Sequence, residues 1–417
     1  MRIAIVGSGV SGLVSAHLLH PLHDITLFEA DDRLGGHAHS HQVRRGDHTY
    51  AIDTGFMVFN DRCYPLLTSL FRDLGIEARD SDMSFSVADD AANIEWCGSN
   101  LRTIFAQPRN LFRPFFWRML RDILRFNKAA LAHLATTSDD VALDEFLRRG
   151  GYSDAFREFY LIPMGASIWS ANPQTFAAFP ARSLFRFLNN HGLLSVANRP
   201  QWRTILGGSV RYVDAIAARL GDRVRCNTAV TAIRRVDGGV AVAWSGGSET
   251  FDHVILATHS TDALRLLQNP SAAEVEVLGA IGYQDNVATL HTDESLMPSR
   301  HAARASWNYR RLIGATAPTL TYDVSRLQGH VGPDTFYVTL NQPEAIDPAT
   351  VIATMHYAHP VFDGPAMAAQ VRHSEISGVD RISYAGAYWG YGFHEDGARS
   401  GVVVAKALGA DVTVVTP

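Results

Sequence analysis

The amino-terminal segment places three glycines at a fixed spacing between an apolar strand and a helix. Residues 3–6 are a short β-branched run of the kind that forms a buried parallel strand, and residues 10–19 fit a helix. Gly7, Gly9 and Gly12 follow the spacing G-x-G-x-x-G. In this motif the first glycine allows a tight turn, the second admits a pyrophosphate, and the third lets helix and strand pack closely. The segment therefore predicts a dinucleotide-binding unit.

A second strand and an acid follow at the distance that such a unit requires. Residues 25–28 fit the next parallel strand, and Glu29 lies about twenty residues past the glycines, where a carboxylate can accept hydrogen bonds from ribose hydroxyls. The amino end of the helix, with Ser11 in its first turn, would face the phosphates. The alternative is a glycine-rich turn that binds no ligand. The flanking strand, helix and spaced acid favour the dinucleotide.

A second glycine-rich motif stands near the carboxyl end, where residues 386–397 read GAYWGYGFHEDG. Nothing in a nicotinamide site calls for such a segment, so the pair of motifs indicates a flavin dinucleotide. We expect a helix from Gly397 to Leu408, whose first N–H groups would stabilise the negative charge of a reduced flavin. Glu395 and Asp396 then have two compatible interpretations, as helix caps or as neighbours of the cofactor.

The composition limits the class of protein. A chain of 417 residues, 47% of them hydrophobic, is long enough for two well-packed domains. Three cysteines without close pairing predict neither disulfides nor a metal site and indicate a reducing, cytoplasmic compartment. The net charge of −5 gives no reason to expect nucleic acid as a partner. No apolar stretch beyond the first strand and helix is long enough to span a membrane.

The pattern of strands and helices predicts an α/β fold with two domains, each built from separate segments. The strand–helix alternation of a Rossmann-like, FAD-binding domain occupies residues 1–58, 203–264 and 381–417. The intervening segments are helical and aromatic in one case and rich in alternating strand-like runs in the other. They predict a second, α+β substrate domain made of residues 59–202 and 265–380.

Further motifs give the sequence a family resemblance. Arg33-x-Gly35-Gly36 and Asp53-x-Gly55, with the two end motifs, resemble the FAD-dependent amine oxidase and phytoene desaturase superfamily. The resemblance implies a discontinuous FAD domain similar to that of p-hydroxybenzoate hydroxylase. More narrowly, the segments 305–309, 325–328 and 337–341 resemble a bacterial flavoprotein subgroup associated with cyclopropane- and methyl-fatty-acid modification, including the route to furan fatty acids.

The resemblance implies a role for each matched position. The glycine loop would hold the pyrophosphate, residues 33–36 would wrap the phosphate and ribityl side, and residues 53–57 would pass beside the isoalloxazine. The residues expected to bind FAD, non-covalently, are Gly7, Gly9, Ser11, Gly12, Glu29, Arg33, Gly35, Gly36, His37, Thr54, Gly55, Val230, Gly386, Glu395, Asp396 and Gly397.

One position departs from the family pattern. Many members carry arginine where this chain has His37, the first of three alternating histidines with His39 and His41. Alternating positions on a strand, without nearby acids or cysteines, make a poor metal site, so we expect no metal. His37 is expected beside the phosphates, and a covalent histidyl flavin remains an alternative.

The lysine content bears on the substrate. Amine oxidases of this superfamily generally place a buried lysine, through a water, at the flavin N5. The only lysines here are Lys128 and Lys406, and neither lies in an expected strand of the substrate domain. The sequence therefore favours dehydrogenation of a lipid acyl chain. The alternatives are an amine or amino-acid oxidase that releases peroxide, and a flavin-bound isomerase or non-redox scaffold.

Aromatic residues near the two flavin motifs are the candidates for substrate contacts. The expected pocket residues are Phe56, Met57, Tyr388 and Phe393. Rings near the flavin, Tyr391 among them, would stabilise cationic character that develops as hydride leaves carbon. His394 is the candidate base, with a purely hydrogen-bonding role as the alternative.

Residues 111–128 are expected to form a helix that is both basic and aromatic. On a helical projection the apolar side chains fill one broad arc and the cations fill a narrow opposite arc. The apolar side chains are Phe115, Phe116, Trp117, Met119, Leu120, Ile123, Leu124 and Phe126. The cations are Arg118, Arg121, Arg125 and Lys128. The arc could pack on the domain core or lie on an anionic membrane surface. The second interpretation predicts a peripheral protein on the cytoplasmic membrane face with a lipid or other hydrophobic substrate.

Overall fold

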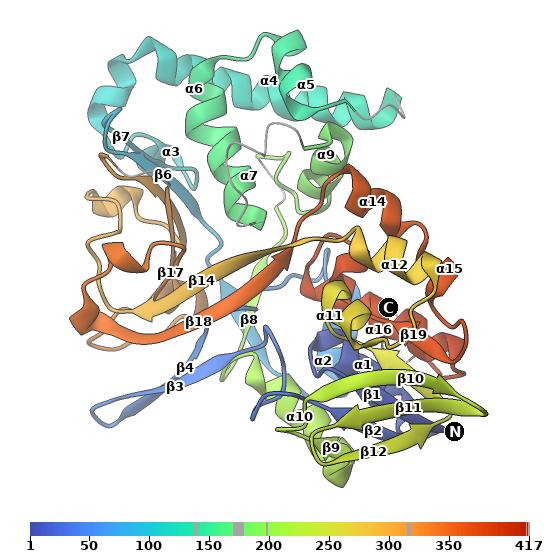
Figure 1. The fold of residues 1–417 in the computed structure, drawn as a ribbon. Helices are drawn as coiled ribbons and strands as arrows, with labels where there is room; N and C mark the ends of the chain where they lie inside the picture. Colours follow the sequence, from blue (N-terminus) through green and yellow to red (C-terminus); the bar gives the residue numbers. More distant parts are fainter. Residues whose placement is uncertain (137–140, 170–178, 197–198, 315–317, 414, 416–417) are drawn as a thin grey trace. The chain divides into compact units, whose positions relative to one another are not determined.

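The computed structural model describes residues 1–136, 141–169, 179–196, 199–314, 318–413 and 415. The chain forms two compact units, each assembled from segments far apart in the sequence. Unit 1 comprises residues 1–79, 204–284 and 360–417. Unit 2 comprises residues 80–203 and 285–359. Figure 1 shows the elements and their labels.

Unit 1 is built on a five-stranded parallel sheet in the order β19-β13-β1-β2-β9. Its strands are β1 (Arg2–Val6), β2 (Asp24–Phe28), β9 (Val224–Arg225), β13 (His253–Leu256) and β19 (Ile382–Tyr384). The central strands are apolar and buried on both faces, as a parallel sheet covered by helices requires. The predicted α/β fold class is confirmed.

The helices of unit 1 begin with α1, which follows β1 and occupies the residues predicted for it. They are α1 (Val10–Leu19), α2 (Pro65–Asp73), α10 (Val210–Leu220), α11 (Ser260–Leu266), α12 (Ala272–Gly279), α14 (Gly364–Gln370), α15 (His373–Ile376) and α16 (His394–Ala407). A three-stranded antiparallel sheet adds β10 (Val230–Val236), β11 (Gly239–Trp244) and β12 (Gly247–Phe251). A hairpin joins β3 (Ser40–Arg45) to β4 (His48–Asp53).

Unit 1 includes stretches of chain that the sequence pattern assigned to the substrate domain. Residues 59–79 belong to unit 1, because α2 packs against α16 of the same unit. Residues 265–284 and 360–380 belong to it as well, since α12, α14 and α15 contribute side chains to its hydrophobic core. These contacts join residues hundreds of positions apart and leave no local signature.

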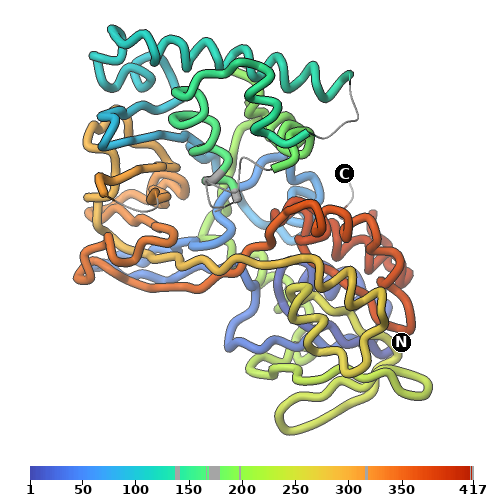
Figure 2. Tube along the Cα trace, turned by 45° about the horizontal axis from the view of Figure 1, so that its top comes forward, coloured from blue at the N-terminus to red at the C-terminus, as the bar shows by residue number. Residues whose placement is uncertain are grey.

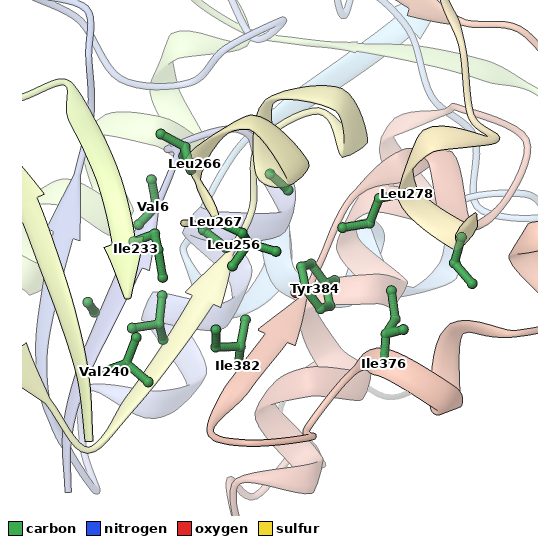
Figure 3. Packing of buried hydrophobic residues seen from close by; sticks show 14 of the residues in the cluster. Val6, Ile233, Val240, Leu256, Leu266, Leu267, Leu278, Ile376, Ile382 and Tyr384 are labelled. Carbon is green, nitrogen blue, oxygen red and sulfur yellow. The ribbon is translucent and has the colours of Figure 1, made fainter. Parts of the chain in front are cut away.

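The core of unit 1 joins both of its sheets to the helices. Figure 3 shows Val6 and Leu256 of the parallel sheet beside Ile233 and Val240 of the antiparallel sheet, with Tyr384 among the neighbouring side chains. The Tyr384 ring is fully buried, and its hydroxyl donates to a carboxylate that is itself buried, Glu274.

Unit 2 contains a seven-stranded sheet in the order β18-β14-β17-β16-β15-β6-β7. Its strands are β6 (Phe85–Asp89), β7 (Ile94–Cys97), β14 (Tyr283–His291), β15 (Trp307–Arg311), β16 (Thr319–Asp323), β17 (Tyr337–Leu340) and β18 (Val351–Pro360). Two further strands, β5 (Ala78–Ser81) and β8 (Trp202–Ile205), pair with one another. The helices are α3 (Leu101–Ile104), α4 (Pro114–Thr136), α5 (Leu143–Gly150), α6 (Asp154–Phe156), α7 (Ile162–Trp169), α9 (Ala181–Asn190) and α13 (Val324–Gln328).

The long helix α4, coloured cyan in Figures 1 and 2, differs from the helix predicted over residues 111–128. It begins at Pro114, after a 3₁₀ turn, and continues to Thr136. The broad apolar arc divides in the structure, because Phe116 and Phe126 are buried whereas Trp117, at one edge of the arc, is exposed. None of the helices in the described part of the chain is long and apolar enough to cross a membrane.

The buried carboxylate of Glu274 provides a test of the unit 1 core. It accepts hydrogen bonds from Arg235 (2.5 Å), from the backbone N–H of Ser271 (2.7 Å) and from the Tyr384 hydroxyl. Burial opposes its ionisation, but these donors outweigh burial and hold the pKa of Glu274 below its usual value.

We expect Tyr384→Phe to lower the free energy of unfolding by about 2 kcal/mol, because the charged acceptor loses a donor that water cannot replace. Urea denaturation measures the change. Tyr309→Phe is the matched control, since Tyr309 is a buried residue whose hydroxyl makes no hydrogen bond to any described residue, and it should cost under about 0.5 kcal/mol. Equal losses in the two variants would contradict this account.

Candidate functional site

The three glycines of the first motif differ in why the fold has glycine at each position. Gly7 has a φ of +99°, and a Cβ there would lie 2.7 Å from the carbonyl oxygen of Ala257. A Cβ at Gly12 would lie 2.0 Å from the carbonyl oxygen of Gly7. Gly9, by contrast, has no atom within 4 Å of the Cβ position. The fold therefore requires Gly7 and Gly12, whereas Gly9 leaves open space at the amino end of α1.

That helix end is suited to an anion. Gly9 is the N-cap, no side chain caps the helix, and no acid lies in the first turn. The N–H of Leu13 is the first to bond within the helix, to the carbonyl of Gly9 at 2.9 Å. The preceding N–H groups, Ser11 among them, are those that a helix leaves unsatisfied, and they carry the positive end of its dipole. Open space and unsatisfied donors together form a phosphate cradle.

Glu29 stands at the end of β2 and is tied to the glycine loop. Its Oε2 accepts hydrogen bonds from the N–H of Ser8 (2.9 Å) and from the Ser8 hydroxyl, and its Oε1 accepts from the N–H of Asp31 (3.0 Å). A carboxylate has about four acceptor positions, so one remains for a ribose hydroxyl. Ser8 was not among the predicted residues, although a hydroxyl between two motif glycines was a usable signal.

The second glycine pair lies directly on the first loop. Gly35 has a φ of +107° and donates its N–H to the carbonyl of Ser8 at 3.1 Å. A Cβ at Gly36 would lie 3.2 Å from the Cα of Gly9. Arg33 stabilises the turn by donating from Nη1 to the carbonyl of Gly36 at 2.9 Å. The structure thus brings together two motifs that the sequence predicts to share the phosphates.

The base of the β3–β4 hairpin joins His37 to the segment after β4. Thr54 donates its N–H to the carbonyl of His39 at 3.0 Å, and Phe56 donates to the carbonyl of His37 at 2.8 Å. A Cβ at Gly55 would lie 2.2 Å from that same His37 oxygen, which explains the glycine.

The remaining histidines of this hairpin pack on one another. The His39 and His41 rings are 4.0 Å apart, and burial, followed by the charge of Arg33, lowers the pKa of His39 to about 4. Among the described residues, no three His, Cys, Asp or Glu side chains are grouped so that they could hold a metal ion.

Asp53 is an anchor whose partners the sequence did not reveal. Its fully buried carboxylate accepts from the hydroxyl of Ser40 (2.5 Å) and from the N–H and hydroxyl of Ser209 (2.9 and 2.8 Å). Burial raises the pKa of Asp53 to about 6 despite these donors. The network fixes the hairpin to the start of α10 (Val210–Leu220), and the only sequence signal was Gly207-Gly208-Ser209 before a helix.

The carboxy-terminal helix differs from its prediction. α16 begins at His394, three residues before Gly397, and the N–H of Gly397 already donates to the carbonyl of Phe393 at 3.0 Å. Gly397 therefore does not offer its N–H to a ligand. Its missing side chain serves packing instead, since a Cβ there would lie 2.5 Å from Cγ1 of Val10. Gly401, one turn later, would meet the carbonyl oxygen of Ser11 at 2.6 Å.

The two acids of this motif act as caps. Glu395 accepts from the N–H groups of Leu66 (3.0 Å) and Leu67 (3.1 Å), so it caps the amino end of α2. Asp396 accepts at 3.1 Å from the N–H groups of Tyr391 and Phe393, which closes the glycine-rich loop on the helix. Burial raises the pKa of Glu395 to about 7 and also raises that of Asp396.

His394 is half-buried and contacts two aromatic side chains. Its ring stacks on Phe56 at a centroid distance of 3.9 Å, and Nε2 lies 3.1 Å from the hydroxyl of Tyr212. Burial lowers the pKa of His394 to about 3, so the imidazole is neutral at physiological pH. Such a group is a weak base, and its contacts favour the hydrogen-bonding role.

The other predicted residues divide between core and surface. Tyr388 belongs to the core of unit 1, tucked beneath Gly386, where a Cβ would lie 2.1 Å from its ring. Val230, the first residue of β10, pairs with Trp244. Met57, Tyr391 and Phe393 are half-buried, and Met57 accepts from the hydroxyl of Thr204 through its carbonyl at 2.9 Å.

Comparison with known proteins places this geometry in a family. Residues 10–326, about three-quarters of the chain, match the family model of flavin-containing amine oxidoreductases. A protein of Mycobacterium tuberculosis named as a flavin-containing monoamine oxidase is 28% identical over 265 residues. The aligned region covers 61% of this chain and 56% of that relative, so the chain spans about half the length of the curated relatives it matches.

Solved structures share the fold across nearly the whole chain. Cyclohexylamine oxidase from Brevibacterium oxydans superposes with a TM-score of 0.70 at 16% identity, covering 98% of this chain and 99% of the other. A fatty acid isomerase from P. acnes that produces conjugated linoleic acid superposes with a TM-score of 0.69 at 17% identity, covering 97% and 98%. At these identities the likeness establishes the fold alone.

The open space at Gly9 predicts that a substitution there weakens FAD binding without changing the stability of the cofactor-free protein. Gly9→Ala should leave the unfolding temperature of the cofactor-free protein unchanged, because its φ of −62° suits alanine and no atom lies near the new methyl. We expect the methyl to obstruct the pyrophosphate of FAD and raise the dissociation constant at least about tenfold, which flavin fluorescence titration measures. Gly12→Ala is the contrasting variant, which should unfold more easily even without FAD. A Gly9→Ala protein with undiminished FAD affinity would contradict the cradle.

The raised pKa of Glu395 predicts a pH dependence of stability near neutrality. A group whose pKa is higher in the folded state stabilises the fold below its unfolded pKa, near 4.5, and that contribution is lost as pH rises through about 7. From pH 5 to 8 the free energy of unfolding of the wild type should fall relative to Glu395→Gln by up to about 3 kcal/mol.

Denaturation at several pH values measures this difference. Asp411→Asn is the control, because hydrogen bonds from Thr413 lower the pKa of that exposed carboxylate and keep it ionised throughout the range. Its offset from the wild type should be constant. A constant offset for Glu395→Gln would show that its pKa is not raised.

The donor set matches the parts of one cofactor. The uncapped end of α1 and the open face at Gly9 suit a pyrophosphate, and the remaining acceptor position of Glu29 suits a ribose. Close packing of Gly397 and Gly401 brings the second motif to the same helix end. With the family match over residues 10–326, the cofactor is FAD, and the chain belongs to the flavin-containing amine oxidoreductase family.

Proposed function

We propose that this protein is an FAD-dependent oxidoreductase that dehydrogenates a hydrophobic substrate, a fatty-acyl chain of the methylated or unsaturated kind. Family membership and the dinucleotide site of unit 1 support the redox part of the proposal. The fold does not choose the substrate, since solved structures of nearly equal TM-score are named for amines and for a fatty acid.

The observation that carries the choice is the position of the lysines. Amine oxidases of the superfamily generally place a buried lysine at the flavin, and the sheet strands of unit 2 in the described chain contain none. Lys128 lies exposed on α4, and Lys406 lies exposed in the last turn of α16. Both ammonium groups therefore face solvent rather than a reaction site.

The sheet of unit 2 adds a second argument. Register and alternation place the side chains of Trp307, Tyr309, Leu320 and Tyr322 on one face, whose end carries the ion pair of Arg311 with Asp89. Their partners on β17, Val338 and Leu340, lie on the same face. The apolar side chains of this face offer dispersion contacts to a hydrocarbon, and its carboxylate, Asp89, is buried and already paired with Arg311.

The first half of the reaction, in which the substrate is oxidised, balances with FAD as the hydride acceptor. FAD supplies the acceptor for a hydride, which leaves one carbon of the chain, while a proton leaves the adjacent carbon and a double bond forms. In the chain itself, neutral His394 and its hydroxyl partner Tyr212 hold Phe56 in place within a water-poor surrounding. The proton passes to water or to another base, because a group with a pKa near 3 retains little affinity for it.

Anaerobic mixing of the holoprotein with candidate substrates tests the proposal. We expect a methyl-branched or unsaturated fatty acid, free or as its phospholipid, to bleach the oxidised flavin band. Mass spectrometry should then find product lighter by two hydrogens. A panel of primary, secondary and aromatic amines should leave the flavin oxidised.

The other outcomes separate the alternatives. Bleaching by an amine, with peroxide released on admission of air, would establish an amine oxidase and overturn the proposal. An isomeric lipid of unchanged mass, formed without net flavin reduction, would establish an isomerase and would overturn it equally.

A further inference from the structure

Helix α4 presents two chemically distinct faces. The buried face consists of Phe116, Met119, Asp122, Phe126 and Ala130, which recur every three or four residues. Asp122 is fully buried and accepts from the N–H of Ser153 at 3.0 Å, which fixes α4 to the start of α6. On the opposite face Trp117, Arg121, Leu124 and Lys128 are exposed to solvent.

An apolar stripe runs along the outward face. Trp117, Leu124 and Leu131 are spaced by seven residues, so they lie above one another on a helix, and their exposed fractions are 49%, 57% and 43%. Before the helix, Phe112 (85% exposed) and Leu101 (75% exposed) present further apolar groups. We name these five residues the α4 apolar stripe. Several exposed apolar groups gathered along one helix are typical of an interaction surface.

Cations flank the stripe on the same face. Arg118, Arg121 and Lys128 are exposed, and none of them forms an ion pair with any residue that the structure describes. Residues 98–136 contain seven Lys and Arg and a single acid, Asp122. That acid is buried and paired with Arg125 at 2.6 Å, which leaves a charge of +6 on this segment.

Two more arginines are held beside the exposed aromatics. Arg109 and Arg113 donate to the carbonyl of Asn93 at 2.7 and 3.0 Å, so each is positioned while its charge stays uncompensated. The guanidinium of Arg113 lies 5.6 Å from the centroid of the Phe115 ring. The indole N–H of Trp117 donates to the carbonyl of Leu111 at 2.8 Å, which orients its ring on the helix surface.

We propose that the outward face of α4 docks unit 2 on an anionic lipid bilayer. The surface is complementary to such a membrane in charge and in polarity: the apolar stripe would enter the acyl boundary and the flanking cations would contact lipid phosphates. A 23-residue helix lying flat in the interface supplies both contacts along its length. The proposal goes beyond the oxidoreductase activity and does not rest on it.

Sedimentation with lipid vesicles tests the docking of the full-length holoprotein. Wild type should bind vesicles of equal parts phosphatidylglycerol and phosphatidylcholine and should not bind vesicles of phosphatidylcholine alone. The triple variant Arg118→Glu, Arg121→Glu, Lys128→Glu should bind the anionic vesicles about 100-fold more weakly or less. Leu124→Ser with Leu131→Ser should weaken binding about tenfold, because the stripe loses its aliphatic contacts.

A matched charge reversal controls for net charge. Arg44→Glu, Arg72→Glu and Arg234→Glu together reverse three exposed cations of unit 1, outside this face, and should keep affinity within about threefold. Retained flavin and an unchanged circular dichroism spectrum show that each variant is folded. The proposal is overturned if the wild type does not bind anionic vesicles or if the two triple variants bind them with equal affinity. It is also overturned if the leucine variant binds them as tightly as the wild type does.

Discussion

The close approach of backbones at the amino end of α1 is the constraint on which the rest of unit 1 depends. The turn of residues 33–36 and the helix α16 both contact the start of this helix, and each does so through glycine. At Gly12 and Gly401 an added Cβ would meet backbone oxygens at 2.0 and 2.6 Å, and backbone cannot turn aside as a side chain can. Among the three glycines of the first motif, Gly9 alone has no atom near an added Cβ, so open space remains where an anion can bind.

The local part of this arrangement could be predicted from the sequence. Helix α1 occupies the residues expected of it, and β1 and β2 begin within one residue of the expected strands. These elements are encoded by apolar periodicity and by glycines next to them, which are local signals. The two glycine motifs could also be assigned to one site, since each is typical of a known part of a dinucleotide fold.

The rest depended on contacts between distant segments. Nothing near Asp53 in the sequence indicates that Ser209 would bind it, and nothing near Glu395 indicates the amino end of α2. The same holds for α4, where hydropathy assigned the largest aromatic side chains to one arc. In the structure Asp122 lies in the buried face, where its carboxylate accepts from the N–H of Ser153, and Trp117 is exposed. Periodicity identifies a helix, but its orientation is decided by the group it packs against.

The acids of the flavin motifs show why residue type alone misleads about function. Glu395 and Asp396 lie in the carboxy-terminal glycine-rich motif, yet both accept hydrogen bonds from backbone N–H groups. Glu395 accepts from the start of α2, and Asp396 accepts from the loop before α16. Asp53 does the same for the hairpin. Burial raises the pKa of all three, and the N–H donors keep that rise moderate. Because these side chains hold the loops, the anion-binding groups that remain are backbone N–H groups at the end of α1. The reaction must therefore be inferred from FAD and from the side chains of unit 2. Among those side chains, the absence of lysine from the strands is more informative than any acid present.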